Sequence, residues 1–138
     1  MKENINKLFD LLFPINRSLI NSGFDKSLNI ICKNLGFKIE KVRSGSKVFD
    51  WTVPYRWEIK DGYIQDSKKI KIVDFKKNNL SVMGYSSPIN KFLDFKDLKK
   101  NLHFIKNKPN WIPYVTSYYK KNWGFSLSYN DFKKLKKG

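Results

Sequence analysis

Residues 44–64 read SGSKVFDWTVPYRWEIKDGYI, and this stretch carries three signals of β-structure. Ser44-Gly45-Ser46 is a turn sequence, and residues 48–53 after it are rich in β-branched and aromatic side chains until Pro54 stops the run. Asp61-Gly62 is a hairpin signal, because both residues accept the backbone angles of a tight turn. The stretch therefore predicts short strands joined by turns.

The same pattern continues on both sides, so that residues 37–86 are predicted to form one small antiparallel β-module. Apolar and charged residues alternate from Phe37 to Val42, which is the two-residue period of a half-exposed strand. After the hairpin signal, short apolar runs are separated by turn sequences such as Asn78-Asn79. The further strands expected here lie at 63–65, 69–73 and 80–86.

Helical periodicity brackets this module. Apolar residues recur every three or four positions in three segments, which are expected as helices at 2–13, 25–35 and 93–105. Pro14 ends the first helix, and Asp25 and Gly36 are suited to cap the second. Asp94 is expected to cap the third helix, which would contain His103. Extended segments at 114–119 and 123–128 and a last short helix complete a predicted α+β fold.

The composition limits the classes of partner. The net charge of +16 comes from 28 basic residues, of which only three are arginines, and the chain contains no alanine. Lysine codons are A/T-rich and alanine codons G/C-rich, so the base composition of the genome accounts for much of the lysine excess. A protein that reads nucleic-acid sequence is expected to use arginine for bidentate contacts. We therefore expect no specific nucleic-acid partner, only weak and salt-sensitive binding.

The sequence also bears on location. No segment is apolar over the roughly 20 residues that a membrane helix requires, and the first residues show no secretion signal. The single cysteine, Cys32, excludes an internal disulfide. These features favour a cytoplasmic protein with no membrane partner, and they are compatible with a homo-oligomer.

Catalytic chemistry has few candidates in this sequence. A catalytic metal centre usually takes three protein ligands from His, Cys, Asp and Glu, but the chain holds one histidine, His103, and one cysteine, Cys32. Cys32 is predicted to be a small buried hydrophobe, and His103 a partly exposed helix residue. We therefore assign no catalytic residue, metal ligand or cofactor to this chain.

Three strings combine aromatic and polar side chains, namely FPINRS (13–18), VFDWTVP (48–54) and YVTSYY (114–119). Their side chains have two interpretations. They contact a substrate, or they pack the β-module and tie its loops through hydrogen bonds. The residues singled out as candidate substrate contacts are Arg17, Asp50, Trp51, Tyr118 and Tyr119.

Longer strings that include these three resemble the N-terminal region of a bacterial family related to the co-catalytic zinc aminopeptidases. The matching strings are LFPINRSL (12–19), SGSKVFDWTVPYRWEIKDGYI (44–64), DFKKNNLSVMGYSSP (74–88) and IPYVTSYYKKNWGFSLS (112–128). The sequence departs from the family pattern at four positions. Ile20-Asn21 stands where the family usually has Thr-Gly. Ser81 stands where a His is expected, and Ser126 stands where a Cys is expected.

The resemblance implies an α/β peptidase-like domain that carries an inserted β-domain of unknown function and, in full-length members, a C-terminal winged helix. It divides this chain into the start of the peptidase-like domain at 1–36, the insertion at 37–110 and a truncated re-entry at 111–138. It also implies zinc, held by ligands that this chain lacks, and a peptide or small amide as substrate.

An insertion leaves and re-enters its host at neighbouring points, so the strand at 123–128 is expected beside the N-terminal helices and outside the β-module. Two separate cores follow from this interpretation. One is expected to contain Leu12, Leu28, Ile31 and Phe125, and the other Phe49, Trp51, Val82 and Tyr85.

Three functions are compatible with the sequence. The resemblance favours a fragment of an aminopeptidase-like metallohydrolase that is not active alone. The second is an aromatic-rich β-module that binds a peptide or a carbohydrate. The third is a basic nucleic-acid-binding protein, against which the scarcity of arginine weighs.

Overall fold

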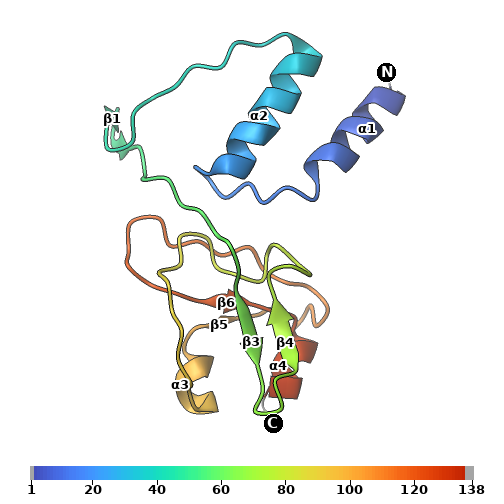
Figure 1. Ribbon diagram of the computed structural model, residues 1–138, viewed down its shortest axis with the longest axis vertical. Coiled ribbons are helices and arrows are strands. Elements are labelled where there is room, and N and C mark those ends of the chain that lie inside the picture. The colour runs from blue at the N-terminus through green and yellow to red at the C-terminus, as the bar shows by residue number, and fades with distance from the viewer. Residues whose placement is uncertain (1, 136–138) are drawn as a thin grey trace. The chain divides into compact units, whose positions relative to one another are not determined.

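The chain divides into two compact units, Met1–Glu58 and Ile59–Gly138, in a computed structural model that describes residues 2–135. Figure 1 shows the two long helices in the first unit and the remaining helices in the second. The first unit contains α1 (Lys2–Leu12), α2 (Ser22–Leu35), β1 (Lys47–Val48) and β2 (Trp51–Thr52). The second contains β3 (Tyr63–Gln65), β4 (Lys71–Asp74), α3 (Phe95–Lys99), β5 (Leu102–His103), β6 (Phe125–Ser126) and α4 (Tyr129–Leu135).

Helix α2 is fixed at both ends by its caps. Asn21 is the N-cap, and its side-chain oxygen accepts a hydrogen bond of 2.7 Å from the Phe24 amide. Gly36 ends the helix with a left-handed φ of 73° and donates its amide to the Cys32 carbonyl, as the sequence predicted. The predicted N-cap, Asp25, is instead in the first turn, because Asn21 captures the free amide and starts the helix three residues earlier.

The segment before α2 passes very close to the helix. A Cβ atom added at Gly23 would lie 1.8 Å from the Asn16 carbonyl oxygen, so only glycine fits there. The Asn21 side-chain amide also donates to the Asn16 side-chain oxygen at 2.9 Å. These contacts fold the loop that carries Arg17 onto the start of α2.

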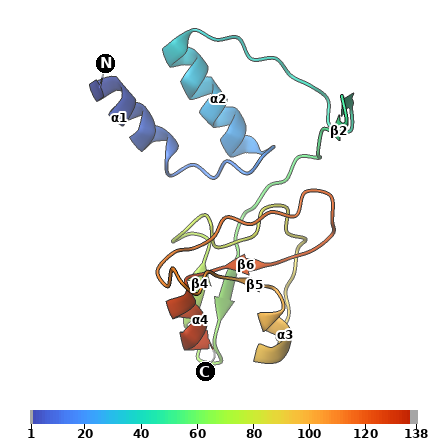
Figure 2. The same ribbon diagram turned by 180° about the vertical axis from the view of Figure 1, so that it is seen from behind.

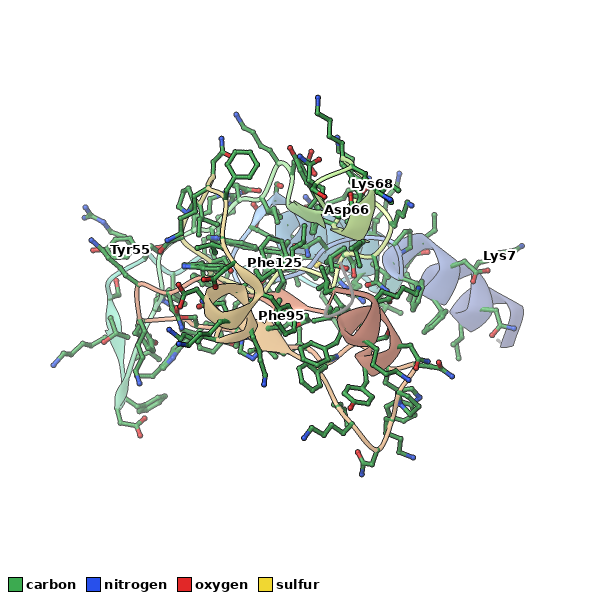
Figure 3. The ribbon with its side chains drawn as sticks, turned by 90° about the horizontal axis from the view of Figure 1, so that it is seen from below. Lys7, Tyr55, Asp66, Lys68, Phe95 and Phe125 are labelled. Atoms are coloured by element: carbon green, nitrogen blue, oxygen red, sulfur yellow. The ribbon has the colours of Figure 1, made fainter. Side chains whose placement is uncertain are left out.

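The strands of the second unit form two separate pairs. β3 and β4 are antiparallel with an irregularity at Ile64/Gln65, and β5 and β6 are parallel. Helix α4 packs beside β4, as both Figure 1 and Figure 2 show. The core of this unit is formed by Ile64, Val73, Leu102, Phe125, Leu127 and Phe132. Phe95 of α3 packs against that core, and Figure 3 labels it together with Phe125.

The predicted position of strand 123–128 is wrong. Phe125 belongs to the core of the second unit, and its amide donates to the Asn101 carbonyl. On the other side of β6, the Ser126 amide donates to the Ser81 carbonyl. The strand therefore completes its hydrogen bonds with residues of the β-rich segment, since a buried strand must pair its backbone groups with whichever neighbours the fold provides.

Residues 37–86 do not form one antiparallel module. β1 and β2 belong to the first unit and β3 and β4 to the second, and residues 37–42 are irregular. The expected common core of Phe49, Trp51, Val82 and Tyr85 is also wrong, because Phe49 is 98% exposed and Trp51 44% exposed. Tight hairpin turns bring strands together only locally, and the burial of each hairpin depends on contacts that turn sequences do not specify.

The third predicted helix, 93–105, is much shorter than expected. Asp94 caps α3 as predicted, accepting from the Asp97 amide at 2.8 Å, but the helix ends at Lys99. Leu102 and His103 form β5 instead, because strand pairing with β6 buries Leu102 in the core. Cys32 is half-buried and is not part of a core. Within residues 2–135, no helix has the length and apolar content needed to cross a bilayer.

Candidate functional site

Four tyrosines gather in the second unit and form what we call the tyrosine cluster: Tyr85, Tyr114, Tyr118 and Tyr119. The rings of Tyr85 and Tyr118 meet edge to face with centroids 5.4 Å apart. The rings of Tyr118 and Tyr119 are 6.2 Å apart with an interplanar angle of 60°. Tyr118 is half-buried, whereas Tyr114 is 58% and Tyr119 60% exposed. The cluster thus has a half-buried centre and two exposed rings.

Backbone hydrogen bonds hold the loop of the cluster in place. The Gly84 amide donates to the Val115 carbonyl at 2.8 Å, and the Ser117 amide donates to the Gly84 carbonyl at 2.9 Å. The Ser117 hydroxyl also donates to the Lys120 carbonyl. Tyr85 follows Gly84 with a φ of 65°, a left-handed conformation that a bulky side chain rarely adopts. These hydrogen bonds hold the backbone that carries the rings.

The environment of the cluster affects the hydroxyl of its central residue. Burial raises the pKa of Tyr118, and the hydrogen bond and charge of neighbouring Tyr114 raise the pKa further. Tyr118 therefore stays protonated at neutral pH and can act as a hydrogen-bond donor or acceptor. This arrangement suits recognition of hydroxyl or carboxylate groups.

The segment that carries the cluster is strongly basic. Residues 106–121 contain Lys106, Lys108, Lys120 and Lys121 and no acidic residue. The Lys108 ammonium lies 5.0 Å from the centroid of the Trp111 ring, and Trp111 is itself 61% exposed. The segment thus combines exposed aromatic rings with positive charges that no acidic residue of the same segment neutralises.

The hairpin of β1 and β2 carries two further candidate residues. Val48 pairs with Trp51, so Phe49 and Asp50 form the two-residue turn. Phe49 has a φ of 55° and is 98% exposed, and Asp50 is also exposed. Glycine is the residue that a turn with this φ prefers at its first position. The tip of the hairpin therefore holds a strained phenylalanine whose ring makes almost no contact within the unit.

The five predicted contact residues are distributed over both units. Tyr118 and Tyr119 are neighbours in the tyrosine cluster. Asp50 and Trp51 are neighbours in the hairpin of the first unit, and Arg17 is exposed in the loop before α2. Their role as substrate contacts stays a prediction.

One polar network in the first unit was missed by the sequence analysis. Arg56 donates from Nη1 to Asp25 Oδ2 at 2.7 Å and from Nε to Glu58 Oε1 at 2.8 Å. Glu58 also accepts from the amide and the hydroxyl of Ser22, both at 2.8 Å. The Ser22 hydroxyl is the first cause that lowers the pKa of Glu58, and Arg56 lowers it further. The sequence RWE at 56–58 contains both charged residues, but no local pattern predicts their contacts with Ser22 and Asp25 of α2.

The residues that the structure describes do not fit a zinc site. Within 2–135, no three His, Cys, Asp or Glu side chains gather closely enough to hold a metal ion. His103 lies in β5, half-buried, and burial lowers its pKa. A Cβ atom at Gly124 would come within 2.8 Å of its Nε2, so the imidazole packs tightly over that glycine. His103 therefore has the surroundings of a packed residue.

Comparison with known proteins assigns the family. Residues 56–138 match the profile of a domain of unknown function, DUF2172. The chain belongs to this family. The matched residues include the whole second unit, with the tyrosine cluster and the parallel pair of β5 and β6.

Two longer proteins are similar to nearly the whole chain. A Clostridium acetobutylicum protein, named "Putative polysaccharide biosynthesis protein with aminopeptidase-like domain", is 51% identical over 131 residues, which are 95% of this chain and 30% of that protein. The crystal structure of a putative peptidase from Clostridium acetobutylicum is similar to this chain, with a TM-score of 0.89 and 50% identity over 96% of this chain and 31% of the solved chain. The chain thus spans just under a third of the length of each of these two proteins.

Proposed function

We propose that this chain is the N-terminal, non-catalytic part of an aminopeptidase-like metallohydrolase. Its first unit docks onto the peptidase-like part of that protein. Zinc, the hydrolytic site and the peptide or small amide substrate belong to the peptidase-like part, since residues 2–135 gather no set of metal ligands. The names of the two similar proteins support the aminopeptidase-like class. A cytoplasmic location is part of the same proposal.

The observation that carries this proposal is the apolar surface of the first unit. α1 and the residue after it expose large side chains that a stable small protein normally buries: Ile5 61%, Phe9 61%, Leu11 57% and Phe13 68%. Phe9 and Phe13 stack on each other with ring centroids 5.5 Å apart. Ile5, Phe9 and Phe13 follow each other at four-residue spacing and so share one face, and an exposed apolar face of this kind supports an interaction site. A similar protein is more than three times as long, and the partner that we propose is the part of such a protein outside the matched 30%.

Co-purification tests the docking. The part of the Clostridium acetobutylicum protein outside the matched region is produced as a separate polypeptide and mixed with this chain. The matched region of the same protein serves as the positive control. We expect this chain to co-purify with the separate part, and Phe9→Ser with Phe13→Ser to weaken the complex at least tenfold. Phe92→Ser is the matched control, because Phe92 is a fully exposed phenylalanine of the second unit.

Two results would overturn the docking proposal. The first is that the positive control binds the separate part of the protein whereas this chain does not. The second is an equal loss of affinity with Phe92→Ser and with the α1 variant.

The tyrosine cluster favours a second function beside docking, namely binding of a carbohydrate. The name of one similar protein includes polysaccharide biosynthesis, and on this basis we propose a carbohydrate ligand for this chain. Exposed tyrosines on a backbone held in advance lose little conformational entropy on binding. The docking surface and the cluster lie in different units, so each function can be tested without the other.

A further inference from the structure

The segment 106–121 presents a combination of side chains that neither docking nor peptide hydrolysis uses. Trp111, Tyr114 and Tyr119 are each about 60% exposed. Four lysines lie in the same sixteen residues, counted from 106 to 121, without an acidic residue among them. A ligand that matches this segment must carry both apolar faces and negative charge.

Sugar rings with carboxylate groups have this chemistry. The axial C–H groups of a pyranose form a weakly positive apolar face, which complements the negative face of an aromatic ring. Lysine ammonium groups pair with carboxylates, and the protonated hydroxyl of Tyr118 donates or accepts hydrogen bonds. We propose that the tyrosine cluster, with Trp111 and the lysines of segment 106–121, binds an acidic oligosaccharide. This names a ligand class for the carbohydrate-binding function, and it rests on that proposal.

Single-stranded nucleic acid also combines rings with negative charge, but the geometry of the cluster favours sugars. Successive bases stack on aromatic platforms through their flat faces. The ring of Tyr118 is inclined at 77° to that of Tyr85 and at 60° to that of Tyr119. Rings inclined in this way offer no continuous stack for successive bases. The segment also contains no arginine, the residue that most often stacks on bases.

Binding of defined probes to the intact 138-residue chain tests the inference. The probes are a galacturonic acid tetrasaccharide, the neutral glucan maltotetraose and a single-stranded DNA octamer, each followed by tryptophan fluorescence and by NMR amide shifts. We expect the acidic tetrasaccharide to bind at least tenfold more tightly than the neutral one. We also expect its binding to weaken as salt rises, because charges are screened.

Two pairs of variants test the assigned residues. Tyr114→Ala with Tyr119→Ala is expected to weaken tetrasaccharide binding at least tenfold, and Lys120→Gln with Lys121→Gln to reduce the preference for the acidic sugar. Tyr63→Ala is the matched control, since Tyr63 is 44% exposed and also lies under a lysine, with Lys71 Nζ 4.2 Å from its ring. The control is expected to bind within twofold of the wild type.

Three results would overturn the inference. They are no acidic-sugar binding at millimolar concentration, an equal loss in the Tyr63→Ala control, and DNA binding as tight as sugar binding through the same tyrosines. The Phe9→Ser and Phe13→Ser chain is measured alongside, and it is expected to bind the sugar normally. If the wild-type chain docks but does not bind the acidic sugar, the inference alone is rejected. If it binds the acidic sugar but does not dock, the docking proposal alone is rejected.

Discussion

At the scale of single residues, two buried serines that lie two positions apart, Ser126 and Ser128, have opposite roles. Ser126 is fully buried, and its hydroxyl has no hydrogen-bond partner among residues 2–135. Ser128 is also buried, but its hydroxyl accepts from the Asp131 amide at 3.0 Å and donates to the Asp131 carboxylate at 2.7 Å. One hydroxyl therefore costs free energy, and the other caps the start of α4.

We predict that Ser126→Ala raises the free energy of unfolding of the second unit by about 1 kcal/mol, because it removes an unsatisfied buried hydroxyl. Ser128→Ala is expected to lower it by about 1 kcal/mol through loss of the helix cap. Urea unfolding followed by circular dichroism measures both. A destabilising Ser126→Ala would mean that the Ser126 hydroxyl has a hydrogen-bond partner, such as a buried water molecule.

Glu58 makes the stability of the first unit depend on pH. The pKa of Glu58 lies below its ordinary value of 4.5, so the folded state favours the carboxylate. The resulting stability is fully present above the unfolded-state pKa and is lost as the pH falls through the folded-state pKa. Because the group is exposed, we expect a contribution of at most about 1 kcal/mol.

The test of this prediction is Glu58→Gln. It is expected to weaken the first unit at pH 7 and to have a much smaller effect near pH 3, measured by urea unfolding through NMR signals of α2. Lys100→Gln is a suitable control, since the Lys100–Asp97 ion pair belongs to the second unit. An effect of Glu58→Gln that is the same at both pH values would exclude the carboxylate as its cause.

At the scale of elements, the hairpin of β1 and β2 is closed by few hydrogen bonds around a strained turn. The Gly45 amide donates to the Val53 carbonyl, and the Val53 amide donates to the Ser46 carbonyl. Phe49 occupies the left-handed conformation at the tip, which costs a residue with a side chain roughly 1–2 kcal/mol. The Phe49 ring is exposed, so its burial within the unit does not offset this free-energy cost.

We predict that Phe49→Gly stabilises this hairpin by about 1 kcal/mol. Slower hydrogen exchange of the Gly45 and Val53 amides would show it. Asp50→Gly is the control, because the turn has a positive φ at Phe49 but not at Asp50. If Phe49→Gly instead speeds exchange at these amides, the ring stabilises the hairpin and the tip is not strained.

At the scale of the whole molecule, the division into two compact units predicts that a core substitution acts mainly on its own unit. Leu127 is 1% exposed in the core of the second unit. We predict that Leu127→Ala costs that unit about 2–5 kcal/mol. Hydrogen exchange is expected to speed up in β3 and β4 while α2 keeps its protection. Leu80→Ala, at a 36% exposed position, is the mild control.

An equal loss of protection in α2 would contradict this prediction. It would mean that the two units unfold together as one cooperative unit. The assignment of 1–36, 37–110 and 111–138 to a peptidase-like domain and its insertion stays a prediction about the longer protein.

The sequence by itself determined the local features of this protein. The C-cap at Gly36 and the N-cap at Asp94 depend on neighbouring residues, and the structure confirms them. The single β run predicted at 48–53 is wrong, because Val48 pairs with Trp51 and residues 49–50 form a turn. The matching strings identified an aminopeptidase-like relationship, because long ordered matches are far more specific than any short motif.

Only the tertiary structure decided which distant segments share a core. The period of residues 93–105 fitted a helix, yet pairing with β6 turned Leu102 and His103 into a strand. Phe125 joined Ile64 and Val73 because β6 finds its backbone partners at 81 and 101. Likewise, Arg56 and Glu58 reach Asp25 and Ser22 across more than thirty residues. Long-range pairing depends on the burial and hydrogen bonding of the folded chain, which no local pattern encodes.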